Sequence, residues 1–145
     1  MELSRANTLV RIRTIEHDIA LAAWGQARMA RVAAEQERDT WIQTLHDWAF
    51  ELRSKNALEA GKLKERLGQI SHARKMLERR EEGIVEALLF EDVQFSSWQQ
   101  AKQRQEGVSR LRDRVETELR AIELHTEQTL VDDITSTRHQ RKGPR

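Results

Sequence analysis

The sequence has no cysteine and no tyrosine, and its single proline, Pro144, stands next to the C-terminus. Without cysteine the chain has no disulfide frame, no thiolate nucleophile and no thiolate metal site, which fits a reducing compartment. Without proline between residues 1 and 143, nothing forces a helix to stop. No run of about 18 apolar residues occurs, so we expect no direct insertion into a membrane. The first residues also lack the apolar core of a signal peptide.

Aromatic residues make up only 5% of the chain, whereas charged residues make up 34%. That composition is poor for a compact globule and typical of long exposed helices, and 145 residues correspond to one domain. The net charge is +1, and the basic residues between 62 and 80 are interleaved with glutamates. A mixed-charge, solvated face explains this pattern better than a nucleic-acid-binding hairpin, so we expect no nucleic-acid partner.

Apolar residues recur every three or four positions, which is the spacing of a helix. The first stripe comprises Leu9, Ile12, Ile15, Ile19, Ala23, Ala27, Ala30, Ala34, Trp41, Leu45, Trp48 and Leu52. It predicts one helix from about residue 5 to about residue 54. Alanines in the middle of the stripe favour close approach of a partner helix.

The periodicity lapses at residues 53–61, where we expect a turn over about 55–60, with Ser54 or Asn56 as the cap of the next helix. A second stripe comprises Leu63, Leu67, Ile70, Leu77, Ile84, Leu88, Phe95, Trp98, Val108, Leu111, Val115, Leu119, Ile122, Leu130 and Ile134. It predicts a helix over about 60–138, followed by a basic tail at 139–145. The stripe blurs at residues 88–98, which is compatible with a kink or a register shift.

Two long amphipathic helices with a short connection favour an all-α fold, an antiparallel coiled-coil hairpin with the second helix longer and overhanging. A turn near residue 57 pairs residue i with about 114 − i, which places Trp24 near Phe90, Trp48 near Arg66 and Met1 near residue 113. The second helix then exceeds the first by roughly 25 residues, or about 40 Å. This overhang still carries apolar residues, so we expect a partner from outside the chain.

The motifs of catalysis and of cofactor binding are missing from the sequence. It has no HExxH motif, no Glu-x-x-His pair and no glycine-rich phosphate loop. A two-helix hairpin also offers no pocket in which a serine or threonine would be activated. We therefore expect no enzymatic activity, no cofactor and no metal site.

Three local sequences carry a resemblance to a known family. LVRIRTIEHDIALAAWGQARMA is an apolar-basic segment followed by acids and alanines, and SSWQQAKQRQEGVSRLRDR combines a tryptophan with basic residues and glutamines. In EQTLVDDITSTR, the matching residues are Glu127, Gln128, Leu130, Asp132, Asp133 and Arg138. With the length and the unequal helices, these segments resemble FliJ of bacterial flagellar export and its counterpart, the central stalk of virulence type III secretion. The residues do not decide between the two.

The resemblance implies a cytoplasmic, non-catalytic protein that is peripheral to the inner membrane through the export apparatus. It implies insertion into the hexameric export ATPase, contact with the cytoplasmic domain of the export gate, and recycling of export chaperones. The ATPase-facing end would comprise Arg5, Arg11, Arg13, Val115, Leu119, Ile122, Leu130, Asp132, Asp133, Ile134 and Arg138. The gate-binding surface would comprise Glu37, Trp41, Thr44, Leu45, Trp48, Leu63, Leu67, Ile70 and Arg74.

Two alternatives stay open at the level of the sequence. Trp41, Leu45 and Trp48 either form a partner-binding surface or only thicken the seam between the helices, and both roles are compatible because a seam residue in so thin a hairpin also faces water. The whole chain is also compatible with a generic coiled-coil adaptor or a self-associating helical bundle, in which the overhang pairs with its twin.

Overall fold

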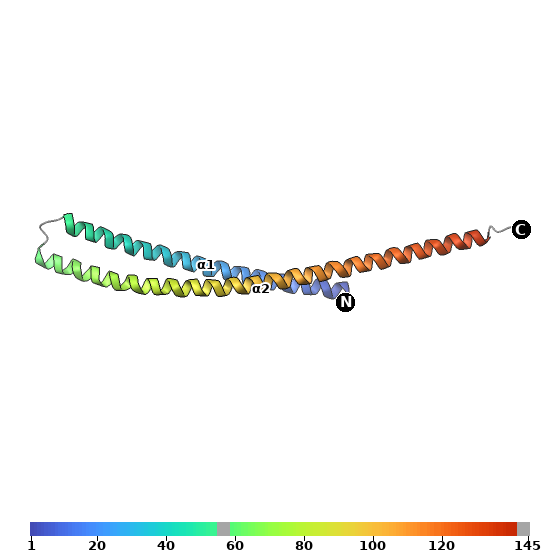
Figure 1. Ribbon diagram of the computed structural model, residues 1–145, viewed down its shortest axis with the longest axis horizontal. Coiled ribbons are helices and arrows are strands. Elements are labelled where there is room, and N and C mark those ends of the chain that lie inside the picture. The colour runs from blue at the N-terminus through green and yellow to red at the C-terminus, as the bar shows by residue number, and fades with distance from the viewer. Residues whose placement is uncertain (55–58, 142–145) are drawn as a thin grey trace. The chain divides into compact units, whose positions relative to one another are not determined.

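The computed structural model, which describes residues 1–54 and 59–141, consists of two helices (Figure 1). Helix α1 spans Leu3–Ser54 and helix α2 spans Ala60–Arg141, and the described residues include no strand. The helices pack against each other as an antiparallel hairpin, which confirms the predicted fold class. In the same residues, neither helix is apolar enough over a sufficient length to cross a membrane.

The ends of the helices lie close to the positions that the sequence predicts. Ser54 is the last residue of α1, and its hydroxyl donates a hydrogen bond to the carbonyl of Glu51 at 3.3 Å, so it does not cap α2. The predicted turn and the alternative cap, Asn56, fall on 55–58, outside the described residues. Helix α2 runs without interruption through residues 88–98 and reaches Arg141, beyond which the tail is not described.

Contacts divide the chain into two units, and each unit contains a piece of both helices. The terminal unit comprises Met1–His17 and Gln100–Arg145, and the middle unit comprises Asp18–Gln99. In both units the buried side chains are mostly small: Ala6, Ala27, Ile70, Ala73, Ile84, Ala101 and Val115. Alanine at a helix interface allows the two backbones to approach closely, but it contributes little apolar area.

An aromatic cluster fixes the pairing of the helices within the middle unit. The ring of Trp24 lies 5.1 Å from the ring of Phe95 and 5.0 Å from the ring of Trp98, measured between centroids. The sequence-based register was therefore wrong here, because it paired Trp24 with Phe90, which is exposed. Near the connection the pairing follows the prediction, because Arg66 lies against Trp48, so the departure arises between that pair and the aromatic cluster.

The predicted α1 stripe was correct at Leu9, Ala23 and Ala27 but wrong at its three isoleucines and at Ala30. Ile12, Ile15 and Ile19 are exposed, with 66% of Ile19 accessible to solvent. The buried and half-buried positions over residues 6–31 are Ala6, Leu9, Val10, Arg13, Thr14, Glu16, His17, Ala20, Ala23, Trp24, Gly25, Ala27 and Arg31. Each isoleucine lies twelve residues before a seam position such as Trp24, Ala27 or Arg31, which turns it about 120° away around the helix axis. The inward face of α1 at Trp24 is the one that packs on the rings of Phe95 and Trp98.

Polar groups complete the seam of both units. In the middle unit, Arg31 forms an ion pair with Glu91 of α2 and donates hydrogen bonds to Glu35 of its own helix at 3.1 Å. The hydrogen bonds to Glu91 and then to Glu35 raise the pKa of the Arg31 guanidinium above its usual value. In the terminal unit, Gln105 Nε2 donates a hydrogen bond to Thr14 Oγ1 at 3.2 Å.

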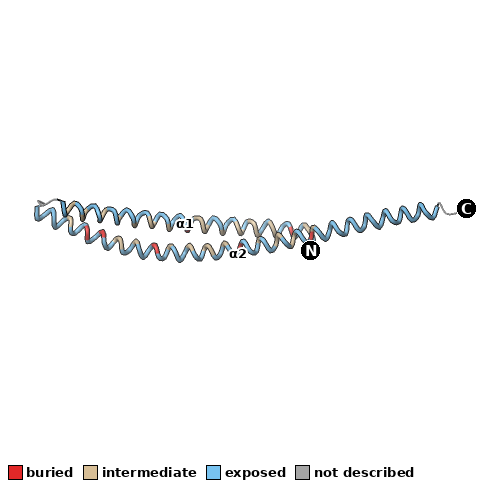
Figure 2. Tube along the Cα trace, turned by 45° about the horizontal axis from the view of Figure 1, so that its top comes forward, coloured by how far each residue is buried: buried red, intermediate tan, exposed pale blue. Residues whose placement is uncertain are grey.

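The last part of α2 has no packing partner among the described residues. From residue 117 to Arg141 every residue is exposed, and Figure 2 shows this segment in the exposed colour throughout. We call residues 117–141 the overhang. Its length agrees with the roughly 25 residues that the sequence predicts. Val115, which the sequence analysis assigned to the overhang, is only 8% exposed and belongs to the paired part of the terminal unit.

Candidate functional site: partner-binding surfaces of the two units

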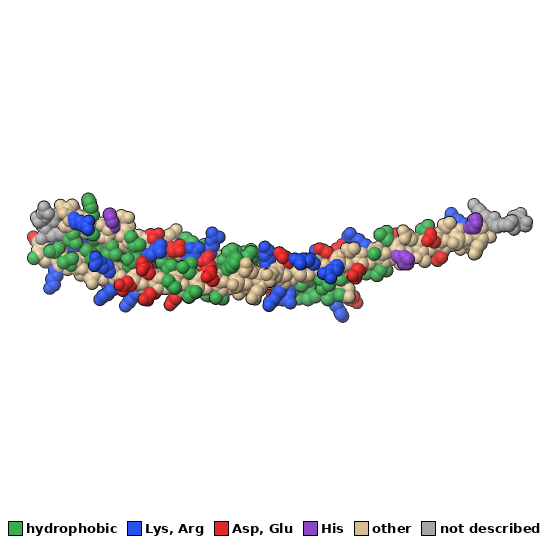
Figure 3. Space-filling model, viewed as in Figure 1, with side chains coloured by type: hydrophobic (Ala, Val, Ile, Leu, Met, Phe, Trp, Pro, Cys, Tyr) green, Lys and Arg blue, Asp and Glu red, His purple; other side chains and the backbone are tan. Residues whose placement is uncertain are grey.

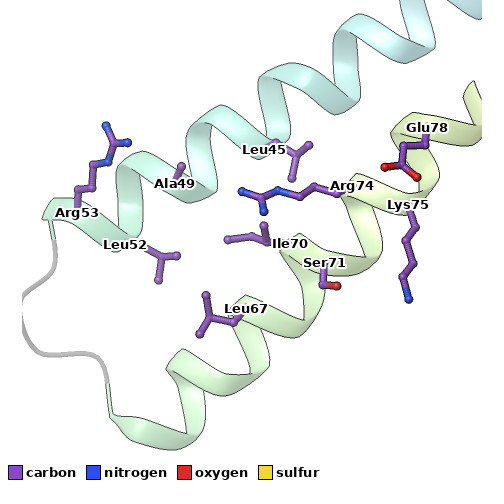
Figure 4. A pocket seen from close by; sticks show the side chains of 10 residues that line it. All are labelled: Leu45, Ala49, Leu52, Arg53, Leu67, Ile70, Ser71, Arg74, Lys75 and Glu78. Atoms are coloured by element: carbon purple, nitrogen blue, oxygen red, sulfur yellow. The ribbon is translucent and has the colours of Figure 1, made fainter. Parts of the chain in front are cut away.

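The middle unit contains an open groove of about 480 Å³ between the last turns of α1 and the early turns of α2 (Figure 4). Its lining residues are Leu45, Ala49, Leu52, Arg53, Leu67, Ile70, Ser71, Arg74, Lys75 and Glu78. We call it the tip groove.

The floor of the tip groove is apolar. In Figure 4 the side chains of Leu52, Leu67 and Ile70 point into the space between the helices, and Leu45 lies at its inner end. Ile70 is buried, but Leu67 keeps 52% of its surface exposed. The floor therefore offers apolar area that stays exposed among the described residues, and burial of such area favours binding of a partner.

The rim of the tip groove is positively charged. Arg53, Arg74 and Lys75 line it together with a single carboxylate, Glu78. Among the described residues, no ion pair joins any of these four side chains to an opposite charge. Arg53 lies in the last turn of α1, where a cation also interacts favourably with the helix dipole, but Arg74 and Lys75 lie well inside α2.

The two tryptophans of helix α1 near the tip, Trp41 and Trp48, are both half-buried. The guanidinium of Arg66 lies 5.2 Å from the centre of the Trp48 ring, which confirms the predicted proximity of these residues. The same arginine forms an ion pair with Glu51 at 3.1 Å. Trp48 is thus part of the seam, with one face held by a cation–π contact, and it still presents surface to solvent.

The overhang in the terminal unit carries large apolar side chains that point into solvent. Its exposed members are Leu119, Ile122, Leu124, Leu130, Val131 and Ile134. At 100° per residue, Leu119, Ile122, Leu130 and Ile134 fall within an arc of about 120°, and Leu124 and Val131 lie beside that arc. Figure 3 shows hydrophobic side chains at the surface of this segment, interleaved with charged ones.

A model of the flagellar FliJ protein family matches residues 2–144, which is nearly the whole chain. The chain belongs to the flagellar FliJ family. This confirms the resemblance seen in the sequence and makes the chain a flagellar export-related protein. Neither a curated protein nor a solved structure matches the chain significantly.

The structure brings together some of the residues that the FliJ resemblance assigned to gate binding. Leu45, Leu67, Ile70 and Arg74 line the tip groove, whereas Trp41, Trp48 and the exposed Leu63 do not. The remaining two are also elsewhere: Glu37 forms an ion pair with Arg80 at 2.7 Å, and the hydroxyl of Thr44 donates to the carbonyl of Thr40. The predicted surface is therefore a groove plus a neighbouring strip of α1.

The residues assigned to the ATPase-facing end of this FliJ-family chain lie in the terminal unit. Leu119, Ile122, Leu130, Asp132, Asp133, Ile134 and Arg138 are exposed on the overhang. Near the N-terminus, Arg5 lies 4.0 Å from Glu2, and Arg13 forms an ion pair with Glu16 at 2.8 Å. Arg11 is exposed and lines a shallow hollow on α1. Val115 is the member that the structure places in the seam instead.

Sequence reasoning missed several side chains of both surfaces. Arg53, Ser71, Lys75 and Glu78 of the tip groove were not singled out, because polar residues beside an apolar stripe look like ordinary solvated positions. Leu124 and Val131 of the overhang were missed because they lie off the main stripe. Their spacing of seven residues places them on one side of the helix, which was the available signal. Over the described ranges, no group of three or more acidic or histidine side chains stands close enough to hold a metal ion.

Proposed function

We propose that this chain is a non-catalytic central-stalk component of a flagellar protein export apparatus. The overhang inserts into the hexameric export ATPase, and the middle unit binds the cytoplasmic domain of the export gate. The observation that carries the proposal is the overhang, 25 consecutive helical residues, 117–141, that are all exposed. An amphipathic helix with no partner in its own chain is most simply explained by a partner elsewhere.

The composition of the overhang suits a contact that forms and releases repeatedly. Its apolar residues are spread along the helix rather than gathered in one patch, and exposed acids, arginines and threonines lie between them. Contacts of this kind are shallow and partly polar, so their affinity is modest and their dissociation is fast. A tightly packed apolar interface between the overhang and the ATPase would prevent rotation of the ring around the helix.

Charged side chains at both ends of the terminal unit add to the proposed ATPase contact. Asp132, Asp133 and Arg138 are exposed on the overhang, and Arg5 and Arg11 are exposed on the first turns of α1. Charges on an exposed surface act mainly on the association rate and on specificity. In this proposal they orient the overhang as it enters the ring, and the apolar residues hold it there.

The gate contact is proposed for the tip groove and the adjoining strip of α1 with Trp41 and Trp48. The support is an uncovered apolar floor, a cationic rim and two half-buried aromatic rings, which are common elements of binding hot spots. The same export role places the chain in the cytoplasm, peripheral to the inner membrane through its partners. We include recycling of export chaperones in the proposal, and its support is membership of the FliJ family alone.

The decisive experiment is a pull-down of the chain against the export ATPase of the same cell, with ATP turnover measured alongside. We expect binding and increased turnover for the full chain. Both should be lost when the chain is cut after Glu116, which removes the overhang but keeps the buried Val115. Trp41→Ala with Trp48→Ala is the matched control, because it alters the middle unit only and should leave ATPase binding unchanged.

The same two variants test the gate contact in the opposite sense. The double tryptophan variant should bind the cytoplasmic domain of the gate more weakly while staying helical by circular dichroism. The chain cut after Glu116 should bind the gate as well as the full chain does. If the truncated chain bound the ATPase as well as the full chain does, the overhang would not be the ATPase-binding segment.

Self-association is the second candidate function, since an exposed amphipathic helix can also pair with its copy in a four-helix arrangement. It predicts a mass that rises with concentration in analytical ultracentrifugation and returns to that of a monomer when the overhang is removed. A monomeric mass of the full chain at every concentration would eliminate this candidate.

A further inference from the structure

The tip groove carries positive charges that no described residue of the chain pairs with. Three cations, Arg53, Arg74 and Lys75, line an apolar floor, and no carboxylate of the described residues forms an ion pair with them. Elsewhere in the middle unit the arginines of the seam are paired: Arg31 with Glu91, Arg66 with Glu51 and Arg80 with Glu37. At the rim of the groove, exposed apolar area and positive charge without an ion pair among the described residues therefore coincide.

We propose that the tip groove binds a short acidic amphipathic helix of the partner protein, with its apolar side chains on the floor and its carboxylates on the cationic rim. Under the proposed function this segment belongs to the export gate, and in that respect the inference rests on the proposed function. The new content is the chemistry of the segment. It must carry leucine-like residues along one face and aspartates or glutamates beside them, because a basic or neutral segment would leave the rim unpaired.

The dimensions of the groove set the length of the bound segment. Its lining on α2 runs from Leu67 to Glu78, which at 1.5 Å per residue spans about 16 Å, or three helical turns. A helix of about 11 residues covers this distance. Two or three of its apolar side chains, spaced three or four residues apart, reach the floor formed by Leu52, Leu67 and Ile70.

The positions of the cations decide how the segment is held. Figure 4 shows the Arg74 side chain reaching across the groove toward α1, while Arg53 and Lys75 extend outward from the two helices. Carboxylates above the floor meet Arg74 first, and those at the edges meet Arg53 and Lys75. Arginine forms two parallel hydrogen bonds with a carboxylate, so Arg74 contributes orientation as well as charge.

The test uses a designed helical peptide of about 14 residues, with leucines on one face and glutamates on both flanks. The control peptide is identical except that lysine replaces each glutamate. Binding to the full chain is measured by fluorescence anisotropy at low and at high salt. We expect the acidic peptide to bind, the basic peptide not to bind, and the affinity to fall as salt screens the charges.

The variant Arg53→Gln, Arg74→Gln, Lys75→Gln removes the rim charges. Its matched control is Lys62→Gln, Lys64→Gln, Arg79→Gln, which removes the same net charge from exposed positions of α2 that do not line the groove. We expect the rim variant to bind the acidic peptide about tenfold more weakly, from three exposed charge pairs, and the control variant to bind like the unaltered chain. Circular dichroism checks that both variants stay helical.

Equal binding by the rim variant and the control variant, or equal binding of the acidic and basic peptides, overturns the inference. Weak peptide binding together with self-association that the rim variant abolishes also overturns it, because the occupant is then the acidic overhang of a second copy. Measuring gate binding with the same two variants distinguishes failure of the acidic-helix inference from failure of the proposed gate contact. A gate that binds all variants equally leaves the proposed function standing without the acidic segment, whereas no gate binding by the unaltered chain refutes the gate role itself.

Discussion

Replacement of Trp24 by alanine gives the sharpest test of how the two helices are held together. Trp24 contacts the rings of Phe95 and Trp98, and these three side chains form the largest cluster of aromatic rings in contact within the middle unit. Most of the other buried residues are alanines, which contribute little when packed. The aromatic cluster should therefore supply a large share of the interhelical stability.

The magnitude follows from the burial of Trp24. Truncation of a fully buried tryptophan to alanine costs about 3–5 kcal/mol, and Trp24 is half-buried, so roughly half of that applies. Loss of two ring–ring contacts adds up to about 1 kcal/mol. We expect the free energy of unfolding to fall by about 2–3 kcal/mol. With an m-value of about 2 kcal/mol/M in urea, the unfolding midpoint should fall by about 1–1.5 M.

The assay is urea unfolding of Trp24→Ala followed by far-UV circular dichroism, with Met29→Ala as the control. Met29 lies on the same helix and is 74% exposed, so its truncation should change the free energy of unfolding by less than about 0.5 kcal/mol. If Trp24→Ala unfolds at the same urea concentration as Met29→Ala, the cluster does not stabilise the pair and the observed register loses its energetic basis.

Three further outcomes are expected. Val115→Asp should lower the free energy of unfolding by about 3 kcal/mol in thermal unfolding because it places a charge in the seam, whereas Ile122→Asp, on the overhang, should have little effect. Arg31→Gln should lower the urea midpoint more at low salt than in 1 M NaCl. Because Glu91 and Glu35 raise the pKa of Arg31 above its usual value, the arginine stays charged throughout the neutral range, so the loss should be the same at pH 6 and pH 9. Removal of residues 117–145 should leave the unfolding midpoint unchanged, since the overhang packs against no described residue.

The architecture was predictable because it depends on long-range features of the sequence. The lack of internal proline and the continuous helical periodicity favoured two long helices, and the unequal lengths of the stripes indicated an overhang. The apolar stripe predicted for α2 was largely correct, with Ile70, Ile84 and Val115 buried. Stripes that run over many turns tolerate local errors, so the fold class and the family were both identified correctly.

The register and the inward face of α1 were not predictable from the same pattern. Bulky isoleucines at 12, 15 and 19 looked like core residues, but a seam built around Trp24 and closely packed alanines turns them outward. Periodicity identifies the apolar face of a helix from hydrophobicity alone. It contains no information about which residues of the partner helix lie opposite. The rim of the tip groove was missed for a related reason, because an arginine is recognised as unpaired only when the positions of all carboxylates are known.

The exposed apolar residues of this chain need a criterion that separates binding surfaces from the geometry of a hairpin. Two helices cover less than half of each other's circumference, so residues such as Ile19, Met29 and Leu89 face solvent as a consequence of the hairpin itself. Exposure by itself therefore indicates nothing in so thin a pair. The overhang differs because no other described residue packs against its 25 residues. The tip groove differs because cations without a described ion-pair partner line its apolar floor. In each case the informative feature is a missing partner, either a helix or an opposite charge, and that is why the proposals rest on these two surfaces.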